Sequence, residues 1–280
     1  DLIKYLEVTD DQFEVAAGTP GMVMTVFTLP NYELVFKIIK DHFEYPKTST
    51  AEDVMDRYRL VFRHDRAGRL LDAQSFEHLA FKRDQFNPDL LAHLLEVAAN
   101  TVRIEGEWVI ISFLYIERRV TPLNLYLRNA TDAAAMAAAY EYGQAIKDLA
   151  ATNIFPGDLF LKNFGVTRHG RVLFYDYDEL CLVDECNFKA IPEPPDYLDE
   201  LSDQVWYPVH PGDVFPEQFV HFLGLKPDLK RYFLAHHKEI LTPEFWEDLK
   251  EKHKNGWWPS VYPYSQTVRL SNTQQTLSVS

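Results

Sequence analysis

Two short strand-like segments, one containing Asn163 and the other followed by Asp176, restrict the fold of this chain more than any other feature. Residues 161–166 and 172–175 are separated by Arg168-His169-Gly170, so they are expected to pair as a β-hairpin. If His169 and Gly170 are the central turn residues, Asn163 pairs with Asp176 at the open end of the hairpin. Two oxygen ligands placed side by side would suit a hard cation such as Mg²⁺.

A third polar residue precedes this hairpin at an informative distance. Asp158 lies five residues before Asn163, an interval typical of a kinase catalytic loop, in which the Asp takes the proton of the acceptor hydroxyl. Lys162 lies within the same interval, and its ammonium group could neutralise a γ-phosphate. Each residue alone could simply cap a loop or begin a turn. The complete set favours phosphoryl transfer.

A lysine within an apolar strand supports the same chemistry. Lys37 lies in the middle of residues 34–39, and apolar residues occupy both faces of this expected strand. A strand lysine of this kind contacts the α- and β-phosphates in kinases. The alternative is that residues 34–39 form an edge strand with Lys37 on its solvent-exposed face. The preceding turn could offer backbone N–H groups to phosphates or could be an ordinary hairpin turn. Its residues are Ala16, Ala17, Gly18, Thr19, Pro20, Gly21 and Met22.

Other residues depart from the common kinase pattern. Pro156-Gly157 stands where His-Arg usually precedes the catalytic Asp, and Asp178 stands where Gly usually ends the Asp-Phe-Gly motif. No Ala-Pro-Glu triplet follows. The sequence is therefore not that of an ordinary eukaryotic-type protein kinase.

The order of elements predicts an α+β fold with two lobes. Strands are expected over residues 13–17, 22–27, 34–39, 101–104 and 108–116, and helices over residues 51–66 and 88–99. An alanine-rich helix should begin at Thr131-Asp132 and end near Ala151, and helical segments are expected at 218–222, 229–237 and 243–252. We therefore expect a protein-kinase-like fold, with an antiparallel-sheet N-lobe (1–128), a mainly helical C-lobe (129–265) and a flexible tail (266–280).

Composition limits the partners and the compartment. The formal net charge of −14 disfavours nucleic acid as the main partner. Only two cysteines occur, Cys181 and Cys186, and neither a signal peptide nor a long apolar run is present, so we expect a soluble cytoplasmic protein away from membranes. Because the chain does not begin with Met, an upstream part is also expected.

With these residues identified, the chain resembles the kinase domain of the bacterial isocitrate dehydrogenase kinase/phosphatase family over about residues 10–265. The similarity is carried by residues 16–22, 35–40, 64–66, 153–158, 162–170 and 174–179.

The resemblance implies an enzyme that uses ATP and Mg²⁺ to phosphorylate a serine of isocitrate dehydrogenase and that also removes this phosphate. Such an enzyme controls flux between the citric acid cycle and the glyoxylate bypass. The resemblance further implies that residues 16–22 and Lys37 bind ATP and that Asp72 is an active-site carboxylate. We expect Asp178 to supply the extra carboxylate for dephosphorylation. In the family, an upstream regulatory domain helps to bind AMP as an allosteric effector; this domain is absent from the chain.

Several alternatives stay open from the sequence. A small-molecule phosphotransferase of the same fold is the second interpretation, and a pseudokinase scaffold is a third that the complete residue set disfavours. A glutamate on a helix is expected to pair with Lys37, and the candidates are Glu52 by its spacing and Glu77 by a later helix. The adenine-contacting segment should lie near residues 115–118.

Overall fold

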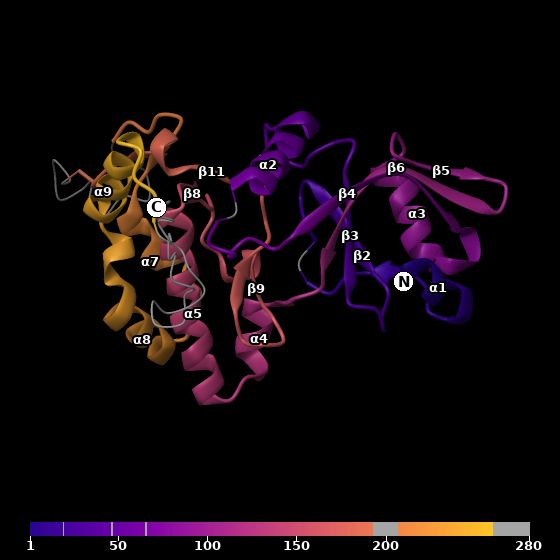
Figure 1. Ribbon diagram of the computed structural model, residues 1–280, viewed down its shortest axis with the longest axis horizontal. Coiled ribbons are helices and arrows are strands. Elements are labelled where there is room, and N and C mark those ends of the chain that lie inside the picture. The colour runs from indigo at the N-terminus through magenta and orange to yellow at the C-terminus, as the bar shows by residue number, and fades with distance from the viewer. Residues whose placement is uncertain (19, 46, 65, 193–206, 260–280) are drawn as a thin grey trace, which may run out of the picture.

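A computed structural model describes residues 1–18, 20–45, 47–64, 66–192 and 207–259. A sheet with its own helices lies at one end of the molecule, and a group of helices lies at the other (Figure 1). The N-terminus is on the sheet side (Figure 1). The expected tail at 266–280 lies outside the described residues.

The large sheet is antiparallel throughout, as the sequence predicted. Its strands are β1 (Glu14–Val15), β2 (Met24–Thr28), β3 (Leu34–Ile39), β4 (Ala73–Lys82), β5 (Val102–Glu105) and β6 (Trp108–Arg118). Their order is β1-β2-β3-β6-β4. Strand β5 also pairs with β6, at residues 108–111, whereas β3 pairs with β6 at residues 115–118. The long strand β6 therefore connects β3, the strand of Lys37, to β4 and β5.

Aromatic packing stabilises one face of this sheet. Phe13 is fully buried, and its ring contacts four others at centroid distances of 4.8–5.6 Å: Phe27, Phe36, Phe81 and Phe86. Helices α1 (Leu2–Val8) and α3 (Pro88–Val97) complete this core through Leu6, Leu90 and Leu94. Burying an aromatic or aliphatic side chain contributes about 1.5–3 kcal/mol. The second helix, α2 (Ala51–His64), packs elsewhere, against Tyr115 and Tyr177.

Two parts of this region were not predicted from the sequence. The helix α1 had no predicted counterpart, and β4 is a strand of 10 residues where none was expected. Residues 74–78 of β4 are all exposed, so they lack the apolar alternation that identifies a half-buried strand. Its pairing with β6, from Ala73 opposite Glu117 to Lys82 opposite Trp108, forms the strand.

The second half is mainly helical, as predicted, although the helix α4 (Leu123–Asn129) had no predicted counterpart. Thr131 caps α5 by accepting a hydrogen bond from the Ala134 N–H at 3.4 Å. The helices are α4 (Leu123–Asn129), α5 (Asp132–Ala151), α7 (Phe219–Phe222), α8 (Pro227–His237) and α9 (Pro243–Lys254). Short strands complete it: β7 (Thr121–Pro122), β8 (Ile154–Phe155), β9 (Phe164–Val166), β10 (Val172–Phe174), β11 (Cys181–Leu182), β12 (Asn187–Phe188) and β13 (Asp213–Val214).

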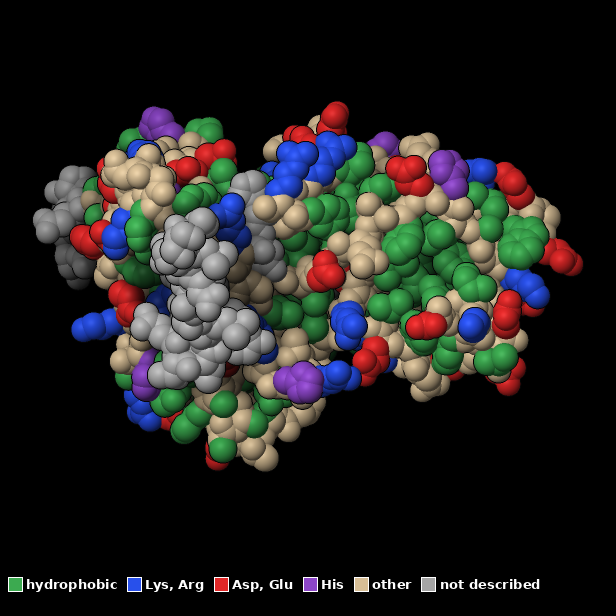
Figure 2. All heavy atoms as spheres, viewed as in Figure 1, with side chains coloured by type: hydrophobic (Ala, Val, Ile, Leu, Met, Phe, Trp, Pro, Cys, Tyr) green, Lys and Arg blue, Asp and Glu red, His purple; other side chains and the backbone are tan. Residues whose placement is uncertain are grey.

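Charged side chains of both signs are interspersed on the face shown in Figure 2. They surround a group of apolar side chains over the sheet-rich half (Figure 2). The net negative charge is therefore not gathered in one patch on this face. Among the described helices, none combines the length and apolar character needed to cross a membrane.

A buried histidine makes the stability of the helical half depend on pH. His237 is 1% exposed at the end of α8 and packs against the rings of Tyr140 and Phe233. Burial, with the charge of Lys147, lowers the pKa of His237 to about 4. Between about pH 6.5 and pH 4 the unfolded chain therefore binds a proton that the folded chain does not, and stability falls as the pH falls.

We expect His237→Gln to lose part of this pH dependence. Urea unfolding of the purified chain between pH 7 and pH 4.5 would measure it, with the exposed neighbour His236→Gln as the matched control. Equal pH slopes for the unmutated chain and His237→Gln would contradict the assignment.

Candidate active site

The predicted hairpin is present, but its register differs from the expected one by one residue. Phe174 pairs with Phe164, and the Tyr175 N–H donates to the Asn163 carbonyl oxygen at 3.1 Å. Asn163 therefore lies opposite Tyr175, not Asp176. The turn has three residues instead of two, and its last, Gly170, has φ +79°, which only glycine adopts readily. Asp176 follows directly after the paired residue, so it still lies at the open end.

Hydrogen bonds hold the segment from Asp158 to Asn163 in a compact loop. The buried Asn163 side chain donates from Nδ2 to the Asp158 carbonyl oxygen at 3.3 Å, which directs its own oxygen away from that carbonyl. The fully buried Tyr142 on α5 donates from its hydroxyl to the Leu159 carbonyl oxygen. Lys162 is exposed beside this loop, with Nζ 5.6 Å from the Phe160 ring centroid. The structure therefore brings Asp158, Lys162 and Asn163 together.

Gly157 has a structural reason to be glycine. It has φ +78°, and a Cβ at this position would lie 2.5 Å from Cβ of Glu179. Any other residue would displace either Asp158 or the segment that carries Asp176 and Asp178. This close approach explains the Pro156-Gly157 departure from the common kinase sequence.

Lys37 is buried, and its surroundings correct one expectation. Its Nζ lies 2.8 Å from Oε2 of Glu117 and donates to the Tyr175 carbonyl oxygen at 2.9 Å. Glu117 lies on β6, two residues after the partner of Lys37 in the sheet. Neither earlier candidate pairs with Lys37: Glu52 is exposed on α2, and Glu77 is exposed on a strand instead of a helix.

This contact places Lys37 beside the predicted metal ligand Asp176, because Tyr175 directly precedes Asp176. Glu117 also belongs to the 115–118 stretch expected near adenine. Its side chain is buried, and burial raises its pKa despite the opposing charge of Lys37. The sequence held a partial signal for Glu117: it is an acidic residue near the end of a mainly apolar strand.

Burial and neighbouring carboxylates raise the pKa of two carboxyl groups of the site, Asp158 and Asp178. Asp158 is exposed at its edge, yet partial desolvation and the charges of Glu179 and Asp176 raise its pKa. Desolvation and the charge of Asp176 raise the pKa of Asp178 to about 7. Such shifts occur where negative groups gather without enough positive charge. The cluster therefore favours binding of cations.

Asp72 is near this cluster through its backbone. The Leu71 N–H donates to the Phe174 carbonyl oxygen at 2.9 Å, and the Tyr177 hydroxyl donates to the Leu71 carbonyl oxygen. The buried Arg69 holds this segment by ion pairs of 2.7 Å with Glu141 and Asp148 on α5. Within the described residues, the exposed Asp72 side chain has no hydrogen bond or ion pair. Its predicted role stays a prediction.

The loop at 16–22 connects β1 to β2, as expected, and lies at the end of the strand next to β3. The Ala16 N–H donates to the Val26 carbonyl oxygen at 3.0 Å, while Ala17, Gly18, Pro20 and Gly21 are exposed. Thr19 lies outside the described residues. The exposed part of the loop is accessible to a ligand.

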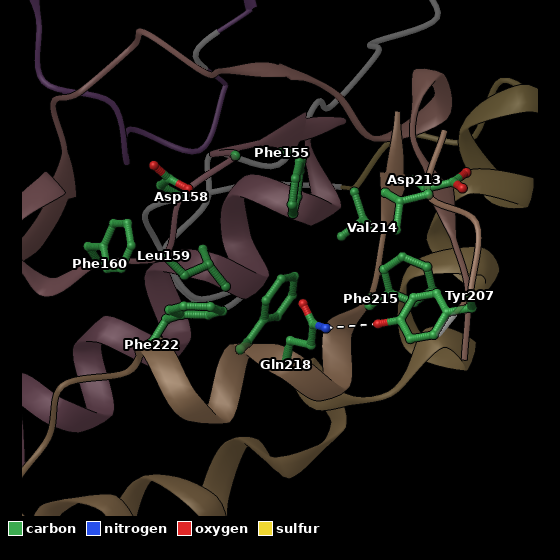
Figure 3. A pocket seen from close by; sticks show the side chains of 13 residues that line it. Phe155, Asp158, Leu159, Phe160, Tyr207, Asp213, Val214, Phe215, Gln218 and Phe222 are labelled. Carbon is green, nitrogen blue, oxygen red and sulfur yellow. Dashed lines mark hydrogen bonds between the residues drawn. The ribbon is translucent and has the colours of Figure 1, made fainter. Parts of the chain in front are cut away.

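A cavity of about 410 Å³ borders Asp158 on the side of α7 (Figure 3). Its polar side chains are partly satisfied: Gln218 donates to the Tyr207 hydroxyl at 2.9 Å, and the buried Asp213 pairs with Lys189 at 2.8 Å. Most other lining side chains are apolar, including Phe155, Leu159, Phe160, Val214, Phe215 and Phe222. The cavity therefore suits an apolar group beside Asp158.

The donor set fits Mg²⁺ when nucleotide phosphates complete it. In the part of the chain that the structure describes, no group of three or more His, Cys, Asp or Glu residues forms a metal site by itself. Asn163 and Asp176 offer two hard oxygen ligands, and Mg²⁺ is commonly held by one or two protein groups plus phosphates and water. Cys181 and Cys186 are free thiols, and their Sγ atoms lie 3.4 Å apart.

These features define an α+β chain with a polar, carboxylate-rich site where a strand lysine meets a catalytic-type loop. Residues 11–266 match the family model described as isocitrate dehydrogenase kinase/phosphatase (AceK) kinase domain. The chain belongs to this family, and the part of the family that it matches is the kinase domain. The predicted α+β, protein-kinase-like fold and the predicted family are confirmed.

Curated relatives agree with this assignment. The chain is 49% identical over 270 residues to an isocitrate dehydrogenase kinase/phosphatase of Anaeromyxobacter sp. (strain Fw109-5), covering 96% of the chain and 47% of the relative. It is also 49% identical over 261 residues to the isocitrate dehydrogenase kinase/phosphatase of Xanthomonas axonopodis pv. citri (strain 306), covering 93% of the chain and 45% of that relative. The chain thus spans about half the length of these relatives. Among solved structures, a ROP18 kinase domain in complex with AMP-PNP and sucrose aligns with TM-score 0.43 and 13% identity, over 91% of this chain and 90% of that one.

Proposed function

We propose that this chain transfers the γ-phosphate of ATP to a serine of isocitrate dehydrogenase and that the same site removes this phosphate. Family membership supports the acceptor. The observation that carries the chemistry is the meeting of Lys37, the Asp158–Asn163 loop and Asp176 at one place. In this proposal residues 1–128 form the nucleotide-binding lobe and residues 129–265 the catalytic lobe.

Each residue has a role in phosphoryl transfer, where catalysis is mainly positioning and neutralisation of charge. Asp158 orients the serine hydroxyl and takes its proton. Lys162 neutralises the γ-phosphate, and Lys37 with the backbone of residues 16–22 binds the other phosphates. Asp72 is retained as an additional active-site carboxylate.

Mg²⁺ would be held by Asn163 and Asp176, and it would neutralise charge on the phosphates. Asp178, with its raised pKa, supplies the further carboxylate that dephosphorylation needs. Its carboxylate is a stronger base than that of an ordinary Asp, so it can accept the proton of the attacking water near neutral pH.

Incubation of the purified chain with Mg·ATP and isocitrate dehydrogenase tests the proposal. Phosphoserine on isocitrate dehydrogenase would support it. Transfer to aminoglycoside or choline acceptors instead would support the small-molecule alternative, and Mg·ATP binding without transfer to any acceptor would contradict the proposed activity.

The apolar cavity beside Asp158 leads to a prediction about the acceptor. A polypeptide whose serine reaches Asp158 must place a neighbouring residue about 3.5 Å further along, at the mouth of the cavity. Phe222 is 47% exposed there and contacts Phe160 edge to face at 5.7 Å. Because burial of one apolar side chain contributes about 1.5–3 kcal/mol, Phe222→Asp should raise KM for isocitrate dehydrogenase about 10-fold or more.

The affinity for Mg·ATP should stay unchanged in this variant, as measured by nucleotide titration. Phe76→Asp is the matched control, since Phe76 is 37% exposed on β4 and does not line the cavity. An unchanged KM for isocitrate dehydrogenase in Phe222→Asp would show that the acceptor does not use the cavity.

A further inference from the structure

Lys47 is a half-buried cation of the site to which no role has been given. It lies in the connection between β3 and α2, where its N–H donates to the Glu44 carbonyl oxygen at 3.0 Å. Its side chain is only 11% exposed, and its ammonium group forms an ion pair with the Glu179 carboxylate. A lysine loses hydration when it is buried in this way, so it needs a compensating partner.

The partner of Lys47 belongs to the catalytic segment. Glu179 directly follows Asp178, and its backbone and Cβ pack against Gly157, which directly precedes Asp158. The ion pair therefore connects the β3–α2 loop to two segments at once: the one with Asp176 and Asp178, and the one with Asp158. This contact joins residues more than 100 positions apart in the sequence.

The charge of Lys47 also acts on the whole carboxylate cluster. Glu179 is its ion-pair partner, and Asp158, Asp176 and Asp178 lie within electrostatic reach. Burial opposes protonation of Lys47, but Glu179, Asp178 and Asp176 together raise its pKa, so it is positively charged at neutral pH. Without this cation, the carboxylates would repel each other more strongly.

We propose that Lys47 is a positioning residue for phosphoryl transfer, because its ion pair with Glu179 holds the Asp176–Glu179 segment against Gly157 and thus in place beside Asp158. The inference rests on the proposed function. Displacing reacting groups by about 1 Å can cost about 100-fold in rate. Lys47→Met should therefore lower kcat for phosphate transfer about 10- to 100-fold, with a change of less than about threefold in KM for Mg·ATP.

Lys47→Arg, which keeps the charge, should recover kcat to within about fivefold. The matched control is Lys40→Met, since Lys40 pairs with Glu44 at 3.3 Å in the same region but does not contact Glu179. A double-mutant cycle that combines Lys47→Met with Glu179→Gln measures the coupling between the two side chains. The double variant should lose no more kcat than the worse of the two single variants. Independent, multiplicative losses, or an unchanged kcat in Lys47→Met, would overturn the inference.

Hydrogen exchange provides a measurement that does not depend on the acceptor. In Lys47→Met, backbone amides of residues 177–180 should exchange at least about fivefold faster than in the unmutated chain, while amides of α5 should be unchanged. If the unmutated chain transferred no phosphate to isocitrate dehydrogenase, the proposed function would fail, and exchange would still decide the role of Lys47. Unchanged exchange at residues 177–180 would refute the positioning role.

Discussion

Asp158→Asn should reduce phosphate transfer to isocitrate dehydrogenase by about 10²- to 10⁴-fold, the usual contribution of a general base. The amide keeps the shape of the side chain but cannot accept the proton of the serine hydroxyl. The hydrogen bond from Asn163 goes to the Asp158 backbone, so the loop should keep its conformation. Single-turnover assays with saturating Mg·ATP would measure the loss.

The same residue predicts how activity depends on pH. Because desolvation and the Glu179 charge raise the pKa of Asp158, its carboxylate is protonated at a higher pH than an ordinary Asp. The rate of transfer should therefore fall as the pH decreases, and it should begin to fall above the pH at which a free Asp is protonated.

Asp248→Asn is the control for Asp158→Asn, since Asp248 is exposed on α9 and, among the described residues, its ion pair is with Lys252 alone. Affinity for Mg·ATP should be nearly the same in all three proteins. If Asp158→Asn retained more than about a tenth of the activity, another group would have to be the base.

Lys37→Met should affect both stability and nucleotide binding. Glu117 has 0% side-chain exposure and would be left without its cation, and breaking a buried ion pair from one side costs about 3–5 kcal/mol. The burial that already raises the pKa of Glu117 would then favour its protonated form further. The loss of a charge-assisted contact should also weaken Mg·ATP binding about 10- to 100-fold.

A second variant separates the two effects of Lys37. Lys37→Met/Glu117→Gln removes the uncompensated carboxylate, so most of the free energy of unfolding should return in urea titrations, whereas Mg·ATP affinity should not. If one nucleotide site serves both reactions, kinase and nucleotide-dependent phosphatase activity should fall together. Loss of kinase activity alone would contradict a shared site.

Much of the candidate site could be read from local sequence. The spacing of Asp158, Asn163 and Asp176 follows from a loop and a hairpin that are close in the chain, so local rules were enough to bring them together. The register was wrong by one residue because the turn has three residues, and Gly170 fits the last position of such a turn as well as the centre of a shorter one.

The contacts between distant segments could not be predicted in the same way. Glu117 was missed as the partner of Lys37, because helices were expected to supply that partner and the pairing of β3 with β6 was not known. Lys47 was missed because it lies in a loop without periodicity. Strand β4 was missed because its exposed residues carry no alternation, and its pairing with β6 was not visible in the sequence.

The sequence by itself determined the α+β class, the major helices, five strands of the large sheet and the loop from Asp158 to Asn163. These features depend on apolar periodicity, capping residues and short spacings, which act between neighbours in the chain. Only the tertiary structure decided which charges meet: Lys37 with Glu117, Lys47 with Glu179, and Arg69 with α5. Ion pairs between distant segments depend on how the sheet and the helices pack, and no local pattern records that packing.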